Sequence, residues 1–101
     1  MPYINPNRRA HFDVEIDSLC DVMRQVGAVK GDVNYTVCRI VLNVLKPYNG
    51  WNYSSLSEAI GALRDAETEL RRRLLDPYEN DSIRKNGDVP EILDEGFRLI
   101  P

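Results

Sequence analysis

The longest helical pattern in the chain is the stretch from Tyr53 to Tyr78, YSSLSEAIGALRDAETELRRRLLDPY. Ser55 and Glu58 have the spacing of a capping box and predict where this helix starts. Pro77 predicts its end at Asp76, because proline disfavours helical geometry in the residue before it. Apolar residues recur at steps of three and four and should share one face: Leu56, Ala59, Ile60, Leu63, Ala66, Leu70 and Leu74.

Two shorter helical patterns precede this stretch. The first is predicted from Asp13 to Val26, and Gly27 suits the left-handed geometry that often ends a helix. The second is predicted over 33–45, with Asp32 as its cap and Pro47 beyond its end. The connection over 27–31 is short, so the second helix should return antiparallel to the first. Small residues around Gly61 predict that a neighbouring helix backbone comes close to the third helix.

These patterns predict an all-α protein built as a three-helix antiparallel bundle. We expect an extended N-terminal arm over 1–12, the bundle over 13–76 and a polar C-terminal tail over 77–101. The tail contains an Asn86-Gly87-Asp88 turn. Its last part has the apolar pattern of one short amphipathic turn: Ile92, Leu93, Phe97 and Leu99.

The second helix is more apolar than a three-helix monomer requires. Cys38 and Leu42 widen its apolar surface beyond one face. We therefore expect another copy of the chain to pack on it, and hence a homo-oligomer. The alternative is that the N-terminal arm covers the second face. The residues of the inner face are Val33, Val37, Ile40, Val41, Val44 and Leu45.

Length and composition restrict the classes of function. The chain has 101 residues and a net charge of −3, which predicts one domain and argues against a nucleic-acid polymer as partner. No apolar run is long enough to cross a membrane, and the N-terminus does not resemble a signal peptide. Cys20 and Cys38 are widely spaced within helical apolar patterns, so they are interpreted as small buried side chains with reduced thiols instead of a disulfide or metal-binding pair. We expect a cytoplasmic protein.

The sequence carries no recognisable catalytic, metal or cofactor motif. His11 is the only histidine, and no positioned partner for a general base is evident. It is expected to be exposed or packed on the neighbouring Phe12. The sequence lacks a phosphate-binding glycine loop and a nucleophile elbow. A non-enzymatic protein is therefore favoured over a small hydrolase or isomerase.

The first candidate ligand-binding group lies on the second helix. Tyr35, Arg39 and Asn43 are spaced four apart, with Lys30 and Asn34 near them. A guanidinium supplies planar paired donors and a tyrosine ring can stack, so the group could hold a phosphate or a nucleobase. The alternative is a solvated face. Trp51 and its neighbouring tyrosines could also stack on a ligand, but sealing the end of the bundle is the favoured interpretation.

The second candidate group is Arg71, Arg72 and Arg73. Glu67 and Arg71 form a favourable i,i+4 pair, as do Glu69 and Arg73. Arg72 has no carboxylate four residues before it, so it is expected to meet the acidic tail or an anion. In an oligomer, arginines from several copies could converge on one anionic ligand.

Motifs in a fixed order resemble a family of small uncharacterised helical proteins of prokaryotes and phages, a domain of unknown function. The resemblance covers about residues 1–89 and implies a small module without an assigned activity. In place of the aromatic residue that the family commonly has before its two arginines, this chain has Arg71. The motifs are Met1-Pro2-Tyr3-Ile4, Gly31-Asp32-Val33-Asn34-Tyr35, Ile60-Gly61-Ala62-Leu63, Arg72-Arg73, Pro77-Tyr78-Glu79 and Asn86-Gly87-Asp88-Val89.

In size and helical build the chain is also similar to phage proteins that sequester cyclic signalling nucleotides as oligomers. That likeness implies, as an expectation only, a phage-encoded protein that acts against host defence signalling. The leading hypothesis is an oligomeric binding protein for a small anionic, nucleotide-like ligand. The alternative is a protein-interaction or regulatory module without a small-molecule ligand.

Overall fold

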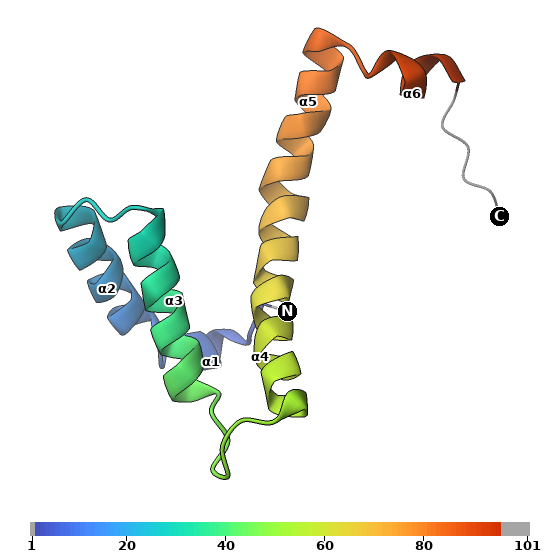
Figure 1. Cartoon of the computed structure of the whole chain (residues 1–101). Coiled ribbons are helices and arrows are strands. Elements are labelled where there is room, and N and C mark those ends of the chain that lie inside the picture. The colour runs from blue at the N-terminus through green and yellow to red at the C-terminus, as the bar shows by residue number, and fades with distance from the viewer. Residues whose placement is uncertain (1, 96–101) are drawn as a thin grey trace. The chain divides into compact units, whose positions relative to one another are not determined.

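The computed structural model describes the backbone of residues 2–95 and the side chains of residues 2–92. Every regular element in the described part of the backbone is helical, which confirms the all-α prediction. Figure 1 shows the elements along the chain. They are α1 (Pro6–Arg9), α2 (Asp13–Gln25), α3 (Lys30–Val44), α4 (Tyr53–Leu70), a π-helical turn (Arg71–Leu75), α5 (Asp76–Asn86) and α6 (Pro90–Glu95).

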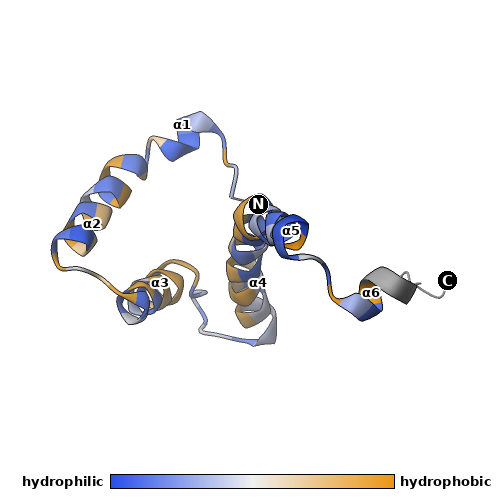
Figure 2. Cartoon of the chain, turned by 90° about the horizontal axis from the view of Figure 1, so that it is seen from above, coloured by the Kyte–Doolittle hydropathy of each residue, from blue (hydrophilic) through white to orange (hydrophobic). Residues whose placement is uncertain are grey.

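The chain divides into two compact units, Met1–Ala66 and Glu67–Pro101. The first unit contains α1, α2, α3 and most of α4, so the three predicted long helices are all present. A closed bundle is not confirmed. Among the side chains that the structure describes, only Ala59 on α4 is buried, at 4% exposure. Figure 2 shows that α2, α3 and α4 each carry hydrophobic and hydrophilic residues.

The connection between α2 and α3 follows the sequence prediction. Gly27 has a φ of 67°, and its amide donates to the Arg24 carbonyl at 3.2 Å. The Ala28 amide donates to the Met23 carbonyl at 2.8 Å. This pair of bonds is a Schellman motif, which satisfies carbonyls at the end of α2 and turns the chain into α3.

Helix α3 begins three residues before the predicted start. Its N-cap is Val29, and Asp32 lies in the first turn instead of at the cap. The Asp32 carboxylate accepts a hydrogen bond from the Val29 amide at 2.8 Å. Asp32 therefore caps the helix from the N3 position, which is where the carboxylate of a capping box lies.

The start of α4 also differs from its prediction. Asn52, not Ser55, is the capping residue, since its carbonyl accepts the Leu56 amide at 3.0 Å. The Asn52 side-chain oxygen accepts the Ser55 amide at 2.9 Å, and the Ser55 hydroxyl accepts the Asn52 amide at 3.0 Å. The reciprocal box lies three residues earlier than predicted, because an asparagine before the serine supplies the better-placed acceptor.

We expect Asn52→Ala to lower the free energy of unfolding by about 1 kcal/mol, because it removes this cap. Urea denaturation followed by circular dichroism, at one fixed protein concentration, measures the change. Asn49→Ala is the matched control, since Asn49 is exposed in the same loop. An equal loss in the two variants would contradict a capping role for Asn52.

The predicted end of the third helix at Asp76 is wrong. Helical backbone continues from Tyr53 to Asn86, and Figure 1 shows no break in the ribbon between α4 and α5. The Asp76 amide donates to the Arg71 carbonyl, five residues back, instead of to a carbonyl four residues back. A proline ring clashes with the carbonyl four residues before it. The wider turn ahead of Pro77 relieves that clash.

The predicted extended arm and polar tail both contain helix. In the arm, Asn5 caps α1 by accepting the Asn7 amide at 2.8 Å. In the tail, α5 ends at Gly87, whose φ is 87°, as the predicted turn requires. Helix α6 includes Ile92, whereas Phe97 and Leu99 of the predicted amphipathic turn lie outside the described residues.

The small residues of α4 have different environments. Ala59 is buried, in agreement with a close neighbour. A Cβ built on Gly61 would meet no atom within 4 Å among the described residues. Within the described residues of one chain, no other helix closes on Gly61, and its approach by another copy stays a prediction.

Candidate functional site

The polar stripe of α3 contains a preformed pair of side chains. The Arg39 guanidinium donates to the Tyr35 hydroxyl at 3.2 Å, and its central carbon lies 5.9 Å from the centre of the Tyr35 ring. The Asn43 amide donates to the Arg39 carbonyl at 2.7 Å. All three residues are exposed. The helix therefore presents an oriented cation and an aromatic ring side by side at its surface.

Lys30 and Asn34 lie on other sides of α3. Each residue of an α-helix turns by roughly 100°, so Lys30 points roughly 180° away from Arg39, and Asn34 roughly 140° away. The structure thus brings Tyr35, Arg39 and Asn43 together, but does not bring Lys30 and Asn34 to the same face. A role of these five residues in ligand binding stays a prediction.

The three consecutive arginines follow the helix instead of converging. Arg71 pairs with Glu67 at 3.0 Å, which confirms the predicted i,i+4 pair. This hydrogen bond and the negative charge of Glu67 raise the pKa of Arg71 above its usual value. Arg71, like Arg73, is exposed to solvent.

Arg72 has a carboxylate partner on its own helix, three residues before it instead of four. Its guanidinium donates two hydrogen bonds to Glu69, three residues before it, at 3.0 and 2.9 Å. The carboxylate predicted to pair with Arg73 is thus engaged by Arg72. An arginine side chain is long enough to reach across three residues as well as four.

The two candidate groups belong to different units, so each is a site of its own. Tyr35, Arg39 and Asn43 lie in Met1–Ala66, and the arginines lie in Glu67–Pro101.

The apolar face of α3 remains open in the described structure. Leu42, which widens the apolar surface beyond the inner face, is 55% exposed, and Cys38 is exposed beside it. The described residues of the N-terminal arm therefore do not bury this second face.

Helices α2 and α3, with His11 and Phe12 just before α2, line an open apolar cleft of about 420 Å³. His11 and Glu15 supply the ionisable groups in its wall, and its residues are His11, Phe12, Glu15, Ile16, Leu19, Ile40 and Val44. The sequence predicted the apolar stripes of both helices but not this cleft. In the sequence, the only indication of this cleft was the short connection over 27–31, which places the apolar stripes of the two helices near each other.

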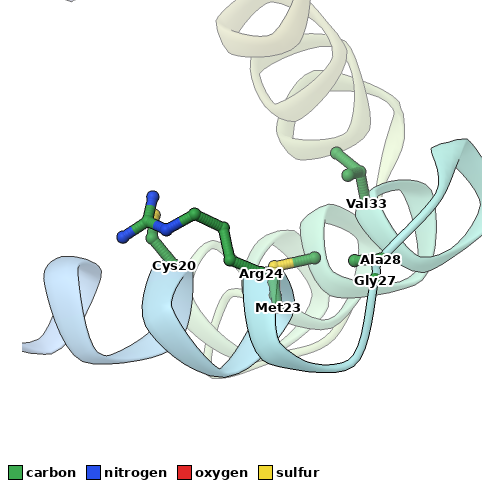
Figure 3. A pocket seen from close by; sticks show the side chains of 6 residues that line it. All are labelled: Cys20, Met23, Arg24, Gly27, Ala28 and Val33. Carbon is green, nitrogen blue, oxygen red and sulfur yellow. The ribbon is translucent and has the colours of Figure 1, made fainter.

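A second hollow, of about 410 Å³, lies where α2 turns into α3. Figure 3 shows the Met23 side chain pointing along it toward Ala28 and Val33. Cys20, Arg24 and Gly27 complete its lining. Both cysteines have free thiols, as the sequence predicted, but the predicted burial is wrong, because Cys20 is half-buried and Cys38 is exposed.

The remaining candidate residues have simple environments. The ring of His11 contacts that of Phe12 edge to face, with centroids 6.1 Å apart, which confirms the predicted packing. Trp51 is half-buried, whereas Tyr48 and Tyr53 are exposed, so the tyrosines do not seal a bundle.

Within the described residues no group of histidine, cysteine and carboxylate side chains could hold a metal. None of the helices in that part of the chain is long and apolar enough to span a bilayer.

These observations define a small all-α protein with exposed apolar helix faces and an exposed tyrosine–arginine pair. The model of one family, described as a domain of unknown function (DUF6899), matches residues 1–89. The chain belongs to this family, which confirms the predicted resemblance to a domain of unknown function. Neither the curated proteins nor the solved structures gave a match.

Proposed function

We propose that the chain is a non-enzymatic binding protein that assembles from several copies and holds a small anionic, nucleotide-like ligand on α3. The observation that supports this proposal is the pair of Tyr35 and Arg39. An arginine has five N–H donors, and the Tyr35 hydroxyl accepts only one of them. Donors remain for the oxygens of a phosphate, and the tyrosine ring beside them can stack on a base.

Association of copies is supported by the exposed apolar surface of the same helix. Burial of Leu42, which is 55% exposed, and of the exposed Cys38 against another copy would remove their side chains from water, which is favourable by roughly 25 cal/mol per Å². Contact between copies through α3 would also bring the polar stripes of two chains closer together. Two Arg39 side chains could then bind one ligand with several phosphates.

The arginines at 71–73 are weaker candidates for ligand contacts than Arg39. Glu67 and Glu69 already engage Arg71 and Arg72. An anionic ligand would have to compete with these carboxylates. Arg39, in contrast, is paired with the neutral hydroxyl of Tyr35.

Titration calorimetry against mononucleotides and cyclic nucleotides tests the proposal. We expect binding of at least one nucleotide, and we expect Arg39→Ala to weaken it by tenfold or more, which corresponds to about 1.4 kcal/mol. Arg39→Lys should recover only part of the affinity, because lysine keeps the charge but loses the paired donors.

Arg24→Ala is the matched control for this experiment. Arg24 is an exposed arginine on α2 that pairs with Asp21, so its removal changes the net charge equally. Arg24→Ala should leave the affinity unchanged. Absence of heat with every nucleotide, or an equal loss with Arg24→Ala, would reject the α3 ligand site.

A second candidate function is a protein-interaction module without a small ligand. The apolar cleft between α2 and α3 favours it, because five of its seven lining residues are hydrophobic. In that case calorimetry shows no nucleotide binding, and a host protein co-purifies with the chain. Ile40→Arg should then prevent co-purification, while Arg39→Ala should not.

A further inference from the structure

Helix α3 carries a second line of exposed residues besides its inner face. The line has the alternating steps of four and three residues that are typical of the contact line between two paired helices. Tyr35, Leu42 and Leu45 in this line are 64%, 55% and 44% exposed. Cys38 is exposed between them. We call this line the seam of α3, and its residues are Gly31, Tyr35, Cys38, Leu42 and Leu45.

The seam lies on the side of α3 that faces away from α2. Ile40 and Val44 line the cleft between the two helices. Each residue of an α-helix turns by roughly 100°, so Leu42 points roughly 160° away from Ile40. Packing of α2 against α3 therefore leaves the seam open to another helix.

The charged residues beside the seam have opposite signs at its two ends. Asp32 lies in the first turn of α3, and Lys46 directly follows the C-cap of the helix. Arg39 lies midway between them, seven residues from each, so the three residues follow one flank of the seam. The other flank carries Asn34 and Val41, which are uncharged.

These charges distinguish the two directions in which a second copy could pair along the seam. In a parallel pair the charged flank of one copy faces the uncharged flank of the other, so no ion pair forms. In an antiparallel pair the two charged flanks face each other. If that pair is centred between Cys38 and Arg39, Asp32 of each copy comes within one residue of the level of Lys46 of the other. The antiparallel pair therefore has an ion pair at each end.

The carboxylate of Asp32 is available for this contact. The Val29 amide donates to one of its oxygens at 2.8 Å, which leaves the other oxygen for Lys46 of the second copy. At the same register, Tyr35 of each copy is level with Leu42 of the other. The exposed side chains of the seam are thus buried against each other.

The antiparallel pair also brings two Arg39 side chains to the same flank. The bond from each guanidinium to the Tyr35 hydroxyl, at 3.2 Å, holds it toward the start of its own helix. The two Tyr35 residues differ in level by seven residues, which corresponds to roughly 10 Å along the axis. The two cations therefore face a common space from its opposite ends, and a single copy supplies only one of them.

We propose that two copies pair antiparallel along the seam of α3, and that one diphosphate or triphosphate group binds between their two Arg39 side chains. This inference rests on the proposed ligand site of α3 and assigns its second half to another copy. Each guanidinium donates paired hydrogen bonds to phosphate oxygens. The anion also offsets the like charges of the two arginines, so ligand binding and association strengthen each other.

Light scattering of the full-length chain in sodium pyrophosphate tests the shared site. Pyrophosphate should strengthen association by about tenfold or more, compared with sodium chloride at the same ionic strength. Calorimetry should give one pyrophosphate bound for two chains. An association that pyrophosphate leaves unchanged would overturn the proposal, and so would one pyrophosphate bound to each chain.

Arg39→Gln separates the anion from the pairing of the helices. Glutamine removes the guanidinium but leaves the seam and the charges at its ends unchanged. This variant should associate at least as strongly as the wild type in sodium chloride, and pyrophosphate should no longer strengthen its association. Arg24→Gln is the matched control, since Arg24 is an exposed arginine on α2, and it should respond as the wild type does. A response to pyrophosphate that persists in Arg39→Gln would overturn the shared site.

Lys46→Glu tests the ion pairs at the ends of the seam. It sets two carboxylates opposite each other at both ends and should weaken association by about tenfold. Lys30→Glu is the matched control with the same change of charge, because Lys30 points roughly 100° away from Gly31 of the seam. Circular dichroism checks that both variants keep their helices. An equal effect of the two substitutions would contradict the antiparallel register.

Disulfide formation tests the orientation, in a background with Cys20→Ala and Cys38→Ala. Gly31 and Leu45 lie at the two ends of the seam, roughly 21 Å apart along the helix. A mixture of Gly31→Cys and Leu45→Cys chains should therefore cross-link between the two variants. Gly31→Cys alone should not, because its Cα atoms would lie too far apart. Cross-linking of Gly31→Cys with itself would indicate a parallel pair and overturn the proposal.

Failure of this inference and failure of the proposed function give different results. Nucleotide binding that depends on Arg39 but does not change association would overturn the shared site and leave a ligand site on each single copy. Absence of binding with every nucleotide and with pyrophosphate would reject the proposed function, and the shared site with it.

Discussion

Ala59→Asp should unfold the Met1–Ala66 unit or lower its free energy of unfolding by several kcal/mol. Ala59 is the one buried side chain in the described part of the chain, at 4% exposure. A carboxylate at this position would be desolvated without gaining a hydrogen-bond or ion-pair partner. An unpaired buried charge is among the most destabilising results of a single substitution. Urea denaturation followed by circular dichroism, at fixed protein concentration, measures the loss.

Ala62→Asp provides the control, because Ala62 is exposed on the same helix. It should cost less than about 1 kcal/mol, the difference in helix propensity between alanine and aspartate. Similar losses in the two variants would indicate that Ala59 is not packed against the rest of the unit.

Gly27→Val should be the second most damaging substitution. Gly27 has a φ of 67°, where a side chain clashes with the backbone and a β-branched residue is a severe outlier. The loss should be roughly 2 kcal/mol, since strain in the left-handed region costs about 1–2 kcal/mol and the Schellman bonds of α2 weaken with it. Thermal unfolding followed by circular dichroism reports the change.

Gly61→Ala is the comparison for this prediction. Gly61 lies inside α4, and a Cβ there meets only open space among the described residues. Alanine should therefore stabilise the helix by about 1 kcal/mol. A destabilised Gly61→Ala chain would mean that another copy or a partner closes on α4 at this point.

Local chemistry explains why some helices could be predicted from the sequence. The bounds of α2 and its link to α3 follow from apolar spacing and from one glycine, both of which act within a few residues. The start of α4 was predicted three residues late. Ser55 does take part in a capping box, but as the partner of Asn52 instead of Glu58.

The passage of the helix through Pro77 could not be predicted from local rules. Proline ends most helices because of its ring and its missing donor. Here a π turn precedes the proline, and no sequence pattern marks such a turn in advance. Arg72 reaches Glu69 across three residues, a pairing that a search for partners four residues away misses.

The candidate site was predicted in part. The four-residue spacing correctly indicated that Tyr35, Arg39 and Asn43 would share a face and contact one another. Lys30 and Asn34 are close to these residues in sequence and were therefore grouped with them. The same helical geometry places both on other sides of α3. Local spacing does not encode contacts with another molecule, so the proposed packing of a copy on the apolar surface of α3 stays a prediction.

The π turn has a mechanical consequence for the longest helix. Pro77 contributes no amide proton, and the neighbouring bond of Asp76 spans five residues instead of four. The backbone near the π turn therefore has fewer hydrogen bonds than the helical turns on either side. We expect amide hydrogens near the π turn to exchange with deuterium before those of the flanking turns. We also expect limited proteolysis to cleave first near the π turn.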